Sequence, residues 1–332
     1  MEYSSLNVRS SGVEALVEDW PGRIGYYKYG YSISGAADHL SHRIANLLVG
    51  NPPGEATIEI AGGLFEAEFE GKALISICGA DLQPAINGSP APMWESIRVG
   101  KGDVVKLSFS RGVGFRSYIA FRGGIDVPLF LGSKSTCIYG RYGGFQGRPL
   151  KQGDKLSVGA SADGDFAGRR VRKENIPRME KEWALRMMPG PTAAPDYVTV
   201  EGMERIYAHQ FSIGRDANRS GYRLVTPKEI FPGSWARTGG GVAGLHPSNI
   251  VDMGYSIPGG LNVAGDQIVV LGPDGPCGGG FVVIGMVAYP DLWKLFQAIP
   301  GRDKVRFKYI GLDDLEELRV PEERKIDEVM LE

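Results

Sequence analysis

Residues 102–109, Gly-Asp-Val-Val-Lys-Leu-Ser-Phe, carry the pattern that decides the fold class: a Gly-Asp pair followed by alternating apolar and polar residues. Glycine can adopt a positive φ and an aspartate side chain can accept hydrogen bonds from nearby amides, so the pair predicts a turn leading into a strand. The same pair recurs at Gly153-Asp154 and Gly265-Asp266, and with one extra residue at 301–303. Such turns indicate a β-meander or barrel rather than alternating strand–helix units.

The composition points the same way. The chain has 48 glycines and 21 prolines among 332 residues, about a fifth of the chain against roughly an eighth on average. So many turn formers exclude a protein of mostly long helices, while 42% hydrophobic residues suffice for a sizeable core. We expect a mainly β fold with a few short helices. Strands are predicted at Ala56–Ile60, Leu64–Phe69, Ala73–Cys78, Val104–Phe109, Ser117–Phe121, Tyr197–Glu201, Ile268–Leu271 and Lys304–Tyr309.

Helical periodicity occurs in two places. Ala36–Val49 places its leucines and Ile44 on one face, with Ser34 as the expected N-cap, and Pro290–Ile299 opens with proline at its first turn. A third candidate, Pro321–Leu331, is mostly charged and is expected on the surface.

A polar, charged stretch at residues 161–182 predicts a linker. It divides the chain into an N-terminal β-rich half, residues 1–160, and a C-terminal β-rich half, residues 183–332. Its basic cluster, Arg169–Lys173, is interpreted as a solvated connection in preference to an anion site.

Charge and motif content exclude several classes of protein. The 37 basic and 39 acidic residues nearly cancel, so neither nucleic acid nor a membrane is an expected partner. Three scattered cysteines, no visible signal peptide and no long apolar run make the cytoplasm the expected location. No phosphate-loop, Gly-x-Ser-x-Gly or His-Glu-x-x-His signature is present. His39 and His42 lack a third ligand nearby, so no metal is expected.

Three glycine-rich loops could bind a ligand. In residues 235–252 a glycine tract runs into His246, Ser248, Asn249 and Asp252, which offer both donors and acceptors to a small polar molecule. The alternative, a turn whose side chains only cap backbone groups, is equally compatible with the composition.

The other two loops are less distinctive. Residues 32–38 precede the first helix, where an anion could meet free amides. Residues 272–281 contain Cys277, either a nucleophile with His246 as base or, more commonly for a cysteine, a small buried hydrophobe.

Blocks of the sequence resemble, in order, one known family. They are Gly30–Asp38, Arg43–Asn51, Thr57–Glu59, Gly79–Asp81, Arg122–Ile125, Leu131–Thr136, Gly143–Arg148 and Asn218–Leu224. They resemble the biotin-dependent carboxyltransferases, a family with the C-type subunit of 5-oxoprolinase, allophanate hydrolase subunit 2 and the carboxyltransferase region of urea carboxylase. The segments 246–250, 265–266, 272–276 and 279–281 are most similar to the urea carboxylase branch. The resemblance implies a fold of cyclophilin-like β-barrel units.

The resemblance also implies an enzyme. It would be a carboxyltransferase subunit that moves a carboxyl group from carboxybiotin, carried on another polypeptide, to a small urea- or amide-like nitrogenous acceptor. Such a transfer needs positioning and hydrogen-bond donors more than acid–base catalysis. The implied catalytic residues are His246, Ser248, Asn249 and Asp252. The implied substrate-binding residues are Asp38, Asn218, Arg219, Arg223 and Asp274.

Implied partners are a subunit-B-like (kinase-inhibitor-like) protein and either a biotin carboxylase with its carrier or the A-type subunit of an oxoprolinase. ATP, if used, would be bound by these partners. Two alternatives stay open: the C-type subunit of an ATP-dependent 5-oxoprolinase-type amidohydrolase, and a non-catalytic antagonist of a kinase-inhibitor-like protein.

The sequence departs from the urea carboxylase pattern beside the proposed site. Two acidic positions of that pattern are Gly239 and Val242 here, and two hydroxyl positions are Ala264 and Cys277. Losing carboxylates changes which N–H groups the site can bind, so urea itself is in doubt as the substrate.

Overall fold

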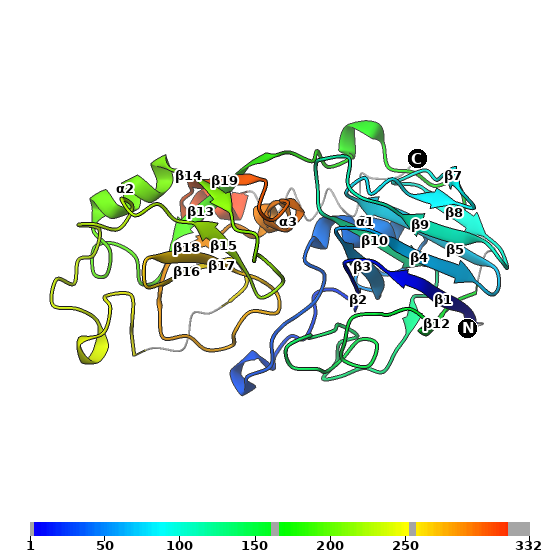
Figure 1. The fold of residues 1–332 in the computed structure, drawn as a ribbon, viewed down its shortest axis with the longest axis horizontal. Coiled ribbons are helices and arrows are strands. Elements are labelled where there is room, and N and C mark those ends of the chain that lie inside the picture. Colours follow the sequence, from blue (N-terminus) through cyan, green and yellow to red (C-terminus); the bar gives the residue numbers. More distant parts are fainter. Residues whose placement is uncertain (1–2, 161–165, 252–256, 318–332) are drawn as a thin grey trace. The chain divides into compact units, whose positions relative to one another are not determined.

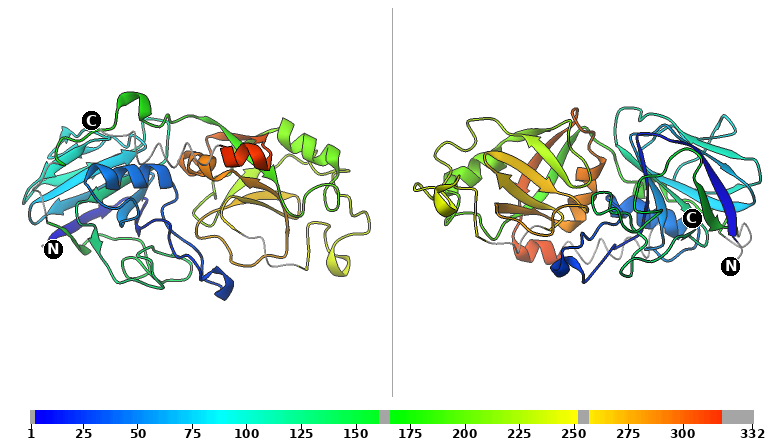
Figure 2. Two further views of the ribbon diagram at one scale, coloured as in Figure 1. Left: turned by 180° about the vertical axis from the view of Figure 1, so that it is seen from behind. Right: turned by 60° about the horizontal axis from the view of Figure 1, so that its bottom comes forward.

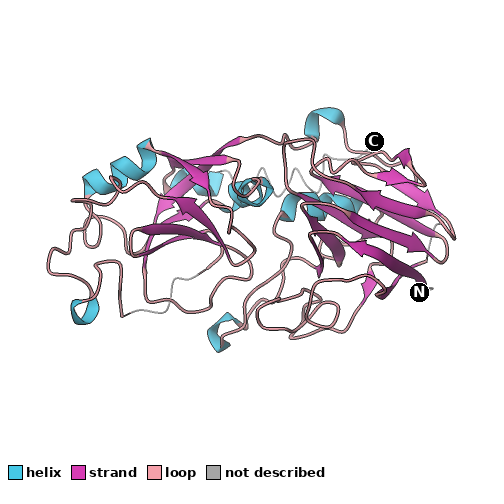
Figure 3. Cartoon of the chain, in the orientation of Figure 1, coloured by secondary structure: helices cyan, strands magenta, loops and turns pink. Residues whose placement is uncertain are grey.

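The computed structural model describes residues 3–160, 166–251 and 257–317, which form two compact units. The first comprises the described residues up to Tyr26 together with Ile33–Met179. The second comprises Tyr27–Ser32 and the described residues from Glu180 onward. Strands dominate both units (Figures 1 and 3), which confirms the mainly β fold class.

The first unit contains two antiparallel sheets. The seven-stranded sheet has the order β11 (Ile125–Asp126), β12 (Lys155–Gly159), β1 (Tyr3–Ser11), β4 (Phe65–Phe69), β9 (Val104–Leu107), β6 (Ala85–Ile86) and β7 (Ser89–Pro90). The five-stranded sheet has the order β2 (Glu14–Glu18), β3 (Thr57–Ala61), β10 (Arg116–Phe121), β5 (Ala73–Gly79) and β8 (Ser96–Val99).

Alternation along the strands builds the core of this unit. Phe65, Ala67 and Phe69 of β4 are buried while the residues between them are partly exposed, as expected of a sheet with one wet face. Strand β5 is buried at every position because α1 (His39–Leu48) covers the outer face of its sheet, as Figure 2 shows from behind.

The second unit is a closed barrel. Its order is β13 (Glu182–Pro189), β18 (Val282–Val287), β16 (Gly260–Ala264), β17 (Gln267–Leu271), β15 (Gly221–Val225), β14 (Gln210–Ile213) and β19 (Lys304–Tyr309). Parallel pairing of β13 with β19 closes a ring that is otherwise antiparallel. Leu261, Val263, Ile268 and Val270 are fully buried. The helices are α2 (Val200–Ala208) and α3 (Tyr289–Gln297).

The turns expected from the Gly-Asp pairs are present. Gly102, Gly153, Gly265 and Gly301 all have positive φ, between 65° and 89°. Asp103, Asp154 and Asp303 accept hydrogen bonds from the amides of Gly100, Lys151 and Ile299, at 2.7, 2.8 and 2.9 Å. Asp266, the fourth aspartate, makes no such bond within the described residues, and its carboxylate faces other side chains.

Two local predictions are wrong. Helix α1 begins later than expected: Asp38 rather than Ser34 is its N-cap, and the Asp38 carboxylate accepts from the Ser41 amide at 2.9 Å. Residues Tyr197–Glu201 form no strand. Thr199 instead caps α2 by accepting from the Gly202 amide, so the β-branched residues there belong to a helix start.

The predicted linker, residues 161–182, contains side chains that pack against other residues. The boundary between the two units at Met179 lies within it. Val171 is buried, and the guanidinium carbons of Arg122 and Arg169 lie 4.3 and 4.1 Å from the centre of the Phe166 ring. The helix expected at Pro321–Leu331 lies outside the described residues. None of the described helices has the length and apolarity needed to cross a membrane.

Candidate functional site

The loop that ends in His246–Asn249 forms a compact polar cluster in the second unit. His246 Nδ1 lies 2.9 Å from Ser248 Oγ and accepts from the Ser248 amide at 3.2 Å. Ser248 Oγ in turn accepts from the amide of Gly265 at 3.0 Å, which ties the loop to the β16–β17 turn. The Asn249 side-chain amide donates to the His246 carbonyl at 3.1 Å. Three of the residues predicted for the site thus lie beside one another.

These contacts fix the tautomer of His246. Ser248 Oγ accepts from the Gly265 amide, and its own hydrogen can be donated to His246 Nδ1. With the Ser248 amide also directed at Nδ1, that nitrogen is an acceptor and the ring hydrogen of the neutral imidazole is on Nε2. Ser248 is fully buried, and its hydroxyl lies against the Nδ1 side of the His246 ring.

Two residues that are not among the predicted site residues complete the cluster. Asp266 Oδ1 lies 3.4 Å from His246 Nε2, and the two side chains are 58% and 37% exposed. The Trp235 ring meets the His246 ring edge-on, with centroids 5.4 Å apart, and its Nε1 donates to Asp266 Oδ1 at 3.3 Å. The sequence does not identify Asp266 as a site residue, because its Gly-Asp pair indicates only a turn. In the structure Asp266 differs from the other three turn aspartates because, among the described residues, it accepts no hydrogen bond from a backbone amide of its turn.

Backbone contacts hold the loop in place. The Ser248 carbonyl accepts from the Val282 amide at 2.9 Å, and the Ile250 amide donates to the carbonyl of Gly280 at 2.8 Å. Gly241 must lack a side chain, because a Cβ there would lie 2.2 Å from the His246 carbonyl oxygen. The glycine tract thus lets the chain pass closely behind the histidine.

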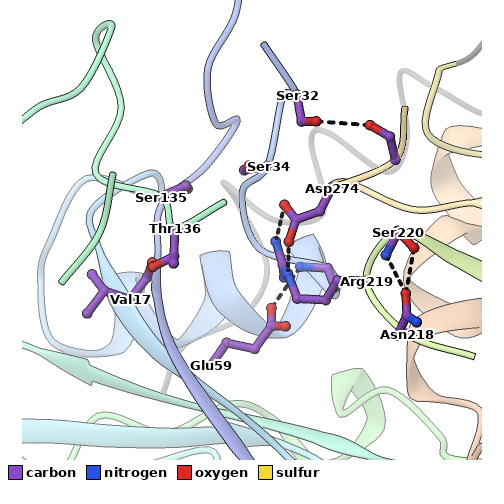
Figure 4. A network of polar contacts seen from close by, with 12 residues as sticks. Val17, Ser32, Ser34, Glu59, Ser135, Thr136, Asn218, Arg219, Ser220 and Asp274 are labelled. Atoms are coloured by element: carbon purple, nitrogen blue, oxygen red, sulfur yellow. Dashed lines mark hydrogen bonds and ion pairs between the residues drawn. The ribbon is translucent and has the colours of Figure 1, made fainter. Parts of the chain in front are cut away.

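Asp274 and Arg219 form a separate pair within the same unit. Arg219 Nε donates to Asp274 Oδ2 at 2.8 Å, and Figure 4 shows the two groups facing each other. Both side chains are at most 1% exposed. A carboxylate that is buried and already bonded to a guanidinium has little capacity left for a ligand, so the pair favours a structural role.

The remaining predicted substrate-binding residues are dispersed. Asn218 folds onto Ser220, accepting from its amide and hydroxyl at 2.8 and 2.7 Å (Figure 4). Arg223 pairs with Asp216 on the surface at 3.3 Å. Asp38 caps α1 in the first unit and is fully buried, so its own carboxylate takes the place expected for an anion. Asp252, which is predicted as a catalytic residue, lies outside the described residues. These four remain predictions as ligand contacts.

Cys277 is partly buried beside a short segment of the same unit. Ser32 Oγ donates to the Gly275 carbonyl at 2.9 Å and lies 3.6 Å from Cys277 Sγ. Tyr27 donates to the Pro276 carbonyl at 2.9 Å, and burial, together with the nearby Cys277, raises the pKa of Tyr27 well above its usual value. The thiol therefore faces the segment Tyr27–Ser32, and its role as a nucleophile with His246 stays a prediction.

The described residues contain no group of three side chains suited to a metal ion. His42 is fully buried, with Nδ1 2.9 Å from Thr57 Oγ1, and burial lowers its pKa to about 3. A hollow of about 610 Å³ in the second unit is lined mainly by apolar residues of α2 and its surroundings, such as Met203 and Tyr207. None of the predicted site residues lines it.

Known proteins are similar to this chain in sequence and architecture. The family model for the carboxyltransferase domain, subdomain A and B, matches residues 29–309. The chain is 36% identical to the urea amidolyase of Lachancea kluyveri, over 97% of this chain and 18% of that protein. It is 28% identical to the C-type subunit of 5-oxoprolinase of Escherichia coli, over 98% of this chain and 97% of that protein.

A solved structure agrees. The urea carboxylase of Kluyveromyces lactis superposes with a TM-score of 0.90 at 35% identity, covering 98% of this chain and 29% of that one. The chain therefore spans less than a third of these urea-processing relatives and nearly all of the oxoprolinase relative. The resemblance inferred from the sequence blocks is confirmed.

Proposed function

Since the chain belongs to the family of carboxyltransferase domains, subdomain A and B, we propose that it is the carboxyltransferase component of a biotin-dependent carboxylase. It would transfer a carboxyl group from carboxybiotin, carried on another polypeptide, to the nitrogen of a small urea- or amide-like acceptor. The observation that carries the proposal is the half-exposed His246 cluster, which lies within the matched residues and offers a fixed hydrogen-bond donor.

The reaction is balanced without further reagents. The bond from the biotin nitrogen to the carboxyl carbon breaks, a bond from that carbon to the acceptor nitrogen forms, and the proton of the acceptor nitrogen ends on biotin. Carboxybiotin supplies the activated carboxyl group when it is bound. The residues of this chain must orient the acceptor, exclude water and stabilise the negative charge that develops.

The cluster suits the acceptor in particular. His246 Nε2–H can donate to the carbonyl oxygen of a urea or amide, and Ser248 keeps that hydrogen on Nε2. His246 does not need to gain or lose a proton in this reaction, because the proton of the acceptor nitrogen is transferred to biotin. Asn249 ties the carbonyl of His246 and so stabilises the loop.

The partners belong to the same proposal. The urea amidolyase relatives contain much more chain than this protein, which agrees with the remaining activities being supplied by other segments or subunits. We propose a subunit-B-like companion and a biotin carboxylase with its carrier, in the cytoplasm, with any ATP bound by those partners. The losses at Gly239 and Val242 favour an acceptor other than urea itself.

One observation favours a second candidate. The chain covers 97% of the length of the C-type subunit of Escherichia coli 5-oxoprolinase, so it matches a polypeptide that works as one component of a lactam-opening amidohydrolase. In that reaction His246 Nε2–H would donate to the lactam carbonyl.

Reconstitution with the companion proteins separates the two candidates. We expect fixation of labelled bicarbonate into a urea- or amide-type acceptor, and we expect avidin to abolish it because avidin sequesters biotin. Lactam opening that consumes ATP and is insensitive to avidin would contradict the carboxylase and establish the amidohydrolase.

A further inference from the structure

The turn aspartates of this protein differ in what they bond. Asp103, Asp154 and Asp303 each accept a backbone amide a few residues earlier, so their carboxylates stabilise their own turns. Asp266 occupies the same position after a glycine of positive φ but turns its carboxylate toward His246 and Trp235. A role other than stabilising the turn is therefore open to Asp266.

We propose that Asp266 and His246 together form an edge that recognises the acceptor through one N–H and one carbonyl group. The inference rests on the proposed function and assigns the specificity of its acceptor site. Asp266 would accept the acceptor N–H, while His246 Nε2–H would donate to its carbonyl oxygen. A primary amide or urea presents this donor and acceptor side by side, so both hydrogen bonds can form at once.

The geometry of the pair leaves both groups available. The separation of 3.4 Å between Asp266 Oδ1 and His246 Nε2 is longer than a normal charge-assisted hydrogen bond. Asp266 Oδ2 has no partner among the described residues, and more than half of the side chain is exposed, so a ligand can reach it. The contact between the two side chains is thus loose enough for an amide to bridge them.

The neighbours fix the edge without covering it. Trp235 donates to Asp266 Oδ1 and packs edge-on against His246, and its ring stacks on Phe231 with centroids 5.1 Å apart. Ser248 holds the opposite side of the imidazole. Both recognition groups are therefore oriented before a ligand binds, which lowers the entropic cost of binding.

This edge discriminates by hydrogen bonding. A site built to accept an N–H strongly disfavours an analogue that lacks it, because the carboxylate then loses water without gaining a partner. Acetamide and N,N-dimethylacetamide differ in this respect: both have the carbonyl, and only acetamide has the N–H.

The test is a titration of the full chain with each amide, followed by the ¹H–¹⁵N signals of the His246 ring. We expect acetamide to bind about tenfold more tightly than the dimethyl compound, the ratio that one charge-assisted hydrogen bond supplies. Asp266→Ala should remove the preference, whereas Asp313→Ala, a change at an exposed aspartate of the same unit, should keep it. Equal binding of the two amides by the natural protein, or a preference that survives Asp266→Ala, overturns the proposal.

A second measurement keeps the proposal falsifiable if Asp266→Ala does not fold. The same spectra of the natural protein at slightly alkaline pH report the tautomer, and we expect the hydrogen on Nε2. A hydrogen on Nδ1 would overturn the proposal, because no donor would then face the ligand. Amide binding needs neither carboxybiotin nor a partner, so its outcome is independent of whether carboxyl transfer is observed.

Discussion

Two acid–base pairs of the second unit differ in almost every physical respect. Arg219 and Asp274 lie 2.8 Å apart and are at most 1% exposed, whereas His246 and Asp266 lie 3.4 Å apart and are 37% and 58% exposed. The first pair is closed to ligands by its burial. The second leaves hydrogen-bonding capacity unused at the surface. The comparison shows that a charged residue in a glycine-rich loop can be buried against a close partner or can keep an exposed carboxylate with hydrogen-bonding capacity to spare.

The largest expected effect tests the closed pair. Arg219→Met removes the guanidinium from a buried carboxylate, and losing one partner of a buried ion pair costs about 3 kcal/mol or more of unfolding free energy. Chemical denaturation measures this loss as a decrease in the unfolding free energy of the second unit.

The double variant Arg219→Met/Asp274→Leu is the matched control. It removes both charges, so it should cost clearly less than the sum of the single changes. Additive effects would show that the pair is not coupled and would weaken the contrast with His246–Asp266.

His42 extends the comparison to a closed group of the first unit. Burial lowers its pKa to about 3, so below the unfolded value of 6.5 the unfolded chain binds more protons than the folded one. The contribution of neutral His42 to the unfolding free energy is fully present above pH 6.5. It decreases as the pH falls toward 3, by up to about 1.4 kcal/mol per pH unit. His42→Gln should flatten the dependence of unfolding free energy on pH in this range. An unchanged slope would contradict the assignment.

A smaller effect distinguishes the two kinds of turn aspartate. Asp303→Ala loses a hydrogen bond to the Ile299 amide in a buried turn and should cost about 1–2 kcal/mol. Asp266→Ala loses no backbone bond and is exposed, so it should cost less than about 0.5 kcal/mol. Thermal or chemical unfolding of both variants checks the difference. Equal losses would assign Asp266 to the turn and not to the ligand.

Most of the fold can be predicted from the sequence because alternation and turns are local. The prediction for Lys304–Tyr309 matches strand β19 at both ends. Three of the four glycine turns follow from Gly-Asp pairs, and the fourth follows from the same pattern with one extra residue at 301–303. Helix α2 is not predicted from the sequence, because the residues at its start, Val198-Thr199-Val200, are β-branched and are typical of a strand. What identifies the helix is the Thr199 side-chain bond to Gly202, which composition does not reveal.

The site is predictable only in part. His246, Ser248 and Asn249 lie within four residues of one another, so their proximity follows from the chain itself. Asp266 comes from the adjacent hairpin, and its contact with His246 depends on the register that brings Gly265 to Ser248. Asp274 lies in a glycine-rich loop, and its burial against Arg219 cannot be read from its sequence surroundings. Burial and partner choice are properties of the folded chain.

The most direct measurement of the acceptor site is kcat/KM for carboxyl transfer by the reconstituted system containing His246→Phe. Phenylalanine keeps a ring against Trp235 but removes the Nε2–H donor. We expect kcat/KM for the acceptor to fall about 100-fold, the usual effect of deleting one donor to developing charge, while carboxylation of the biotin carrier is unchanged. An unaltered kcat/KM in a correctly folded variant would show that the acceptor binds elsewhere.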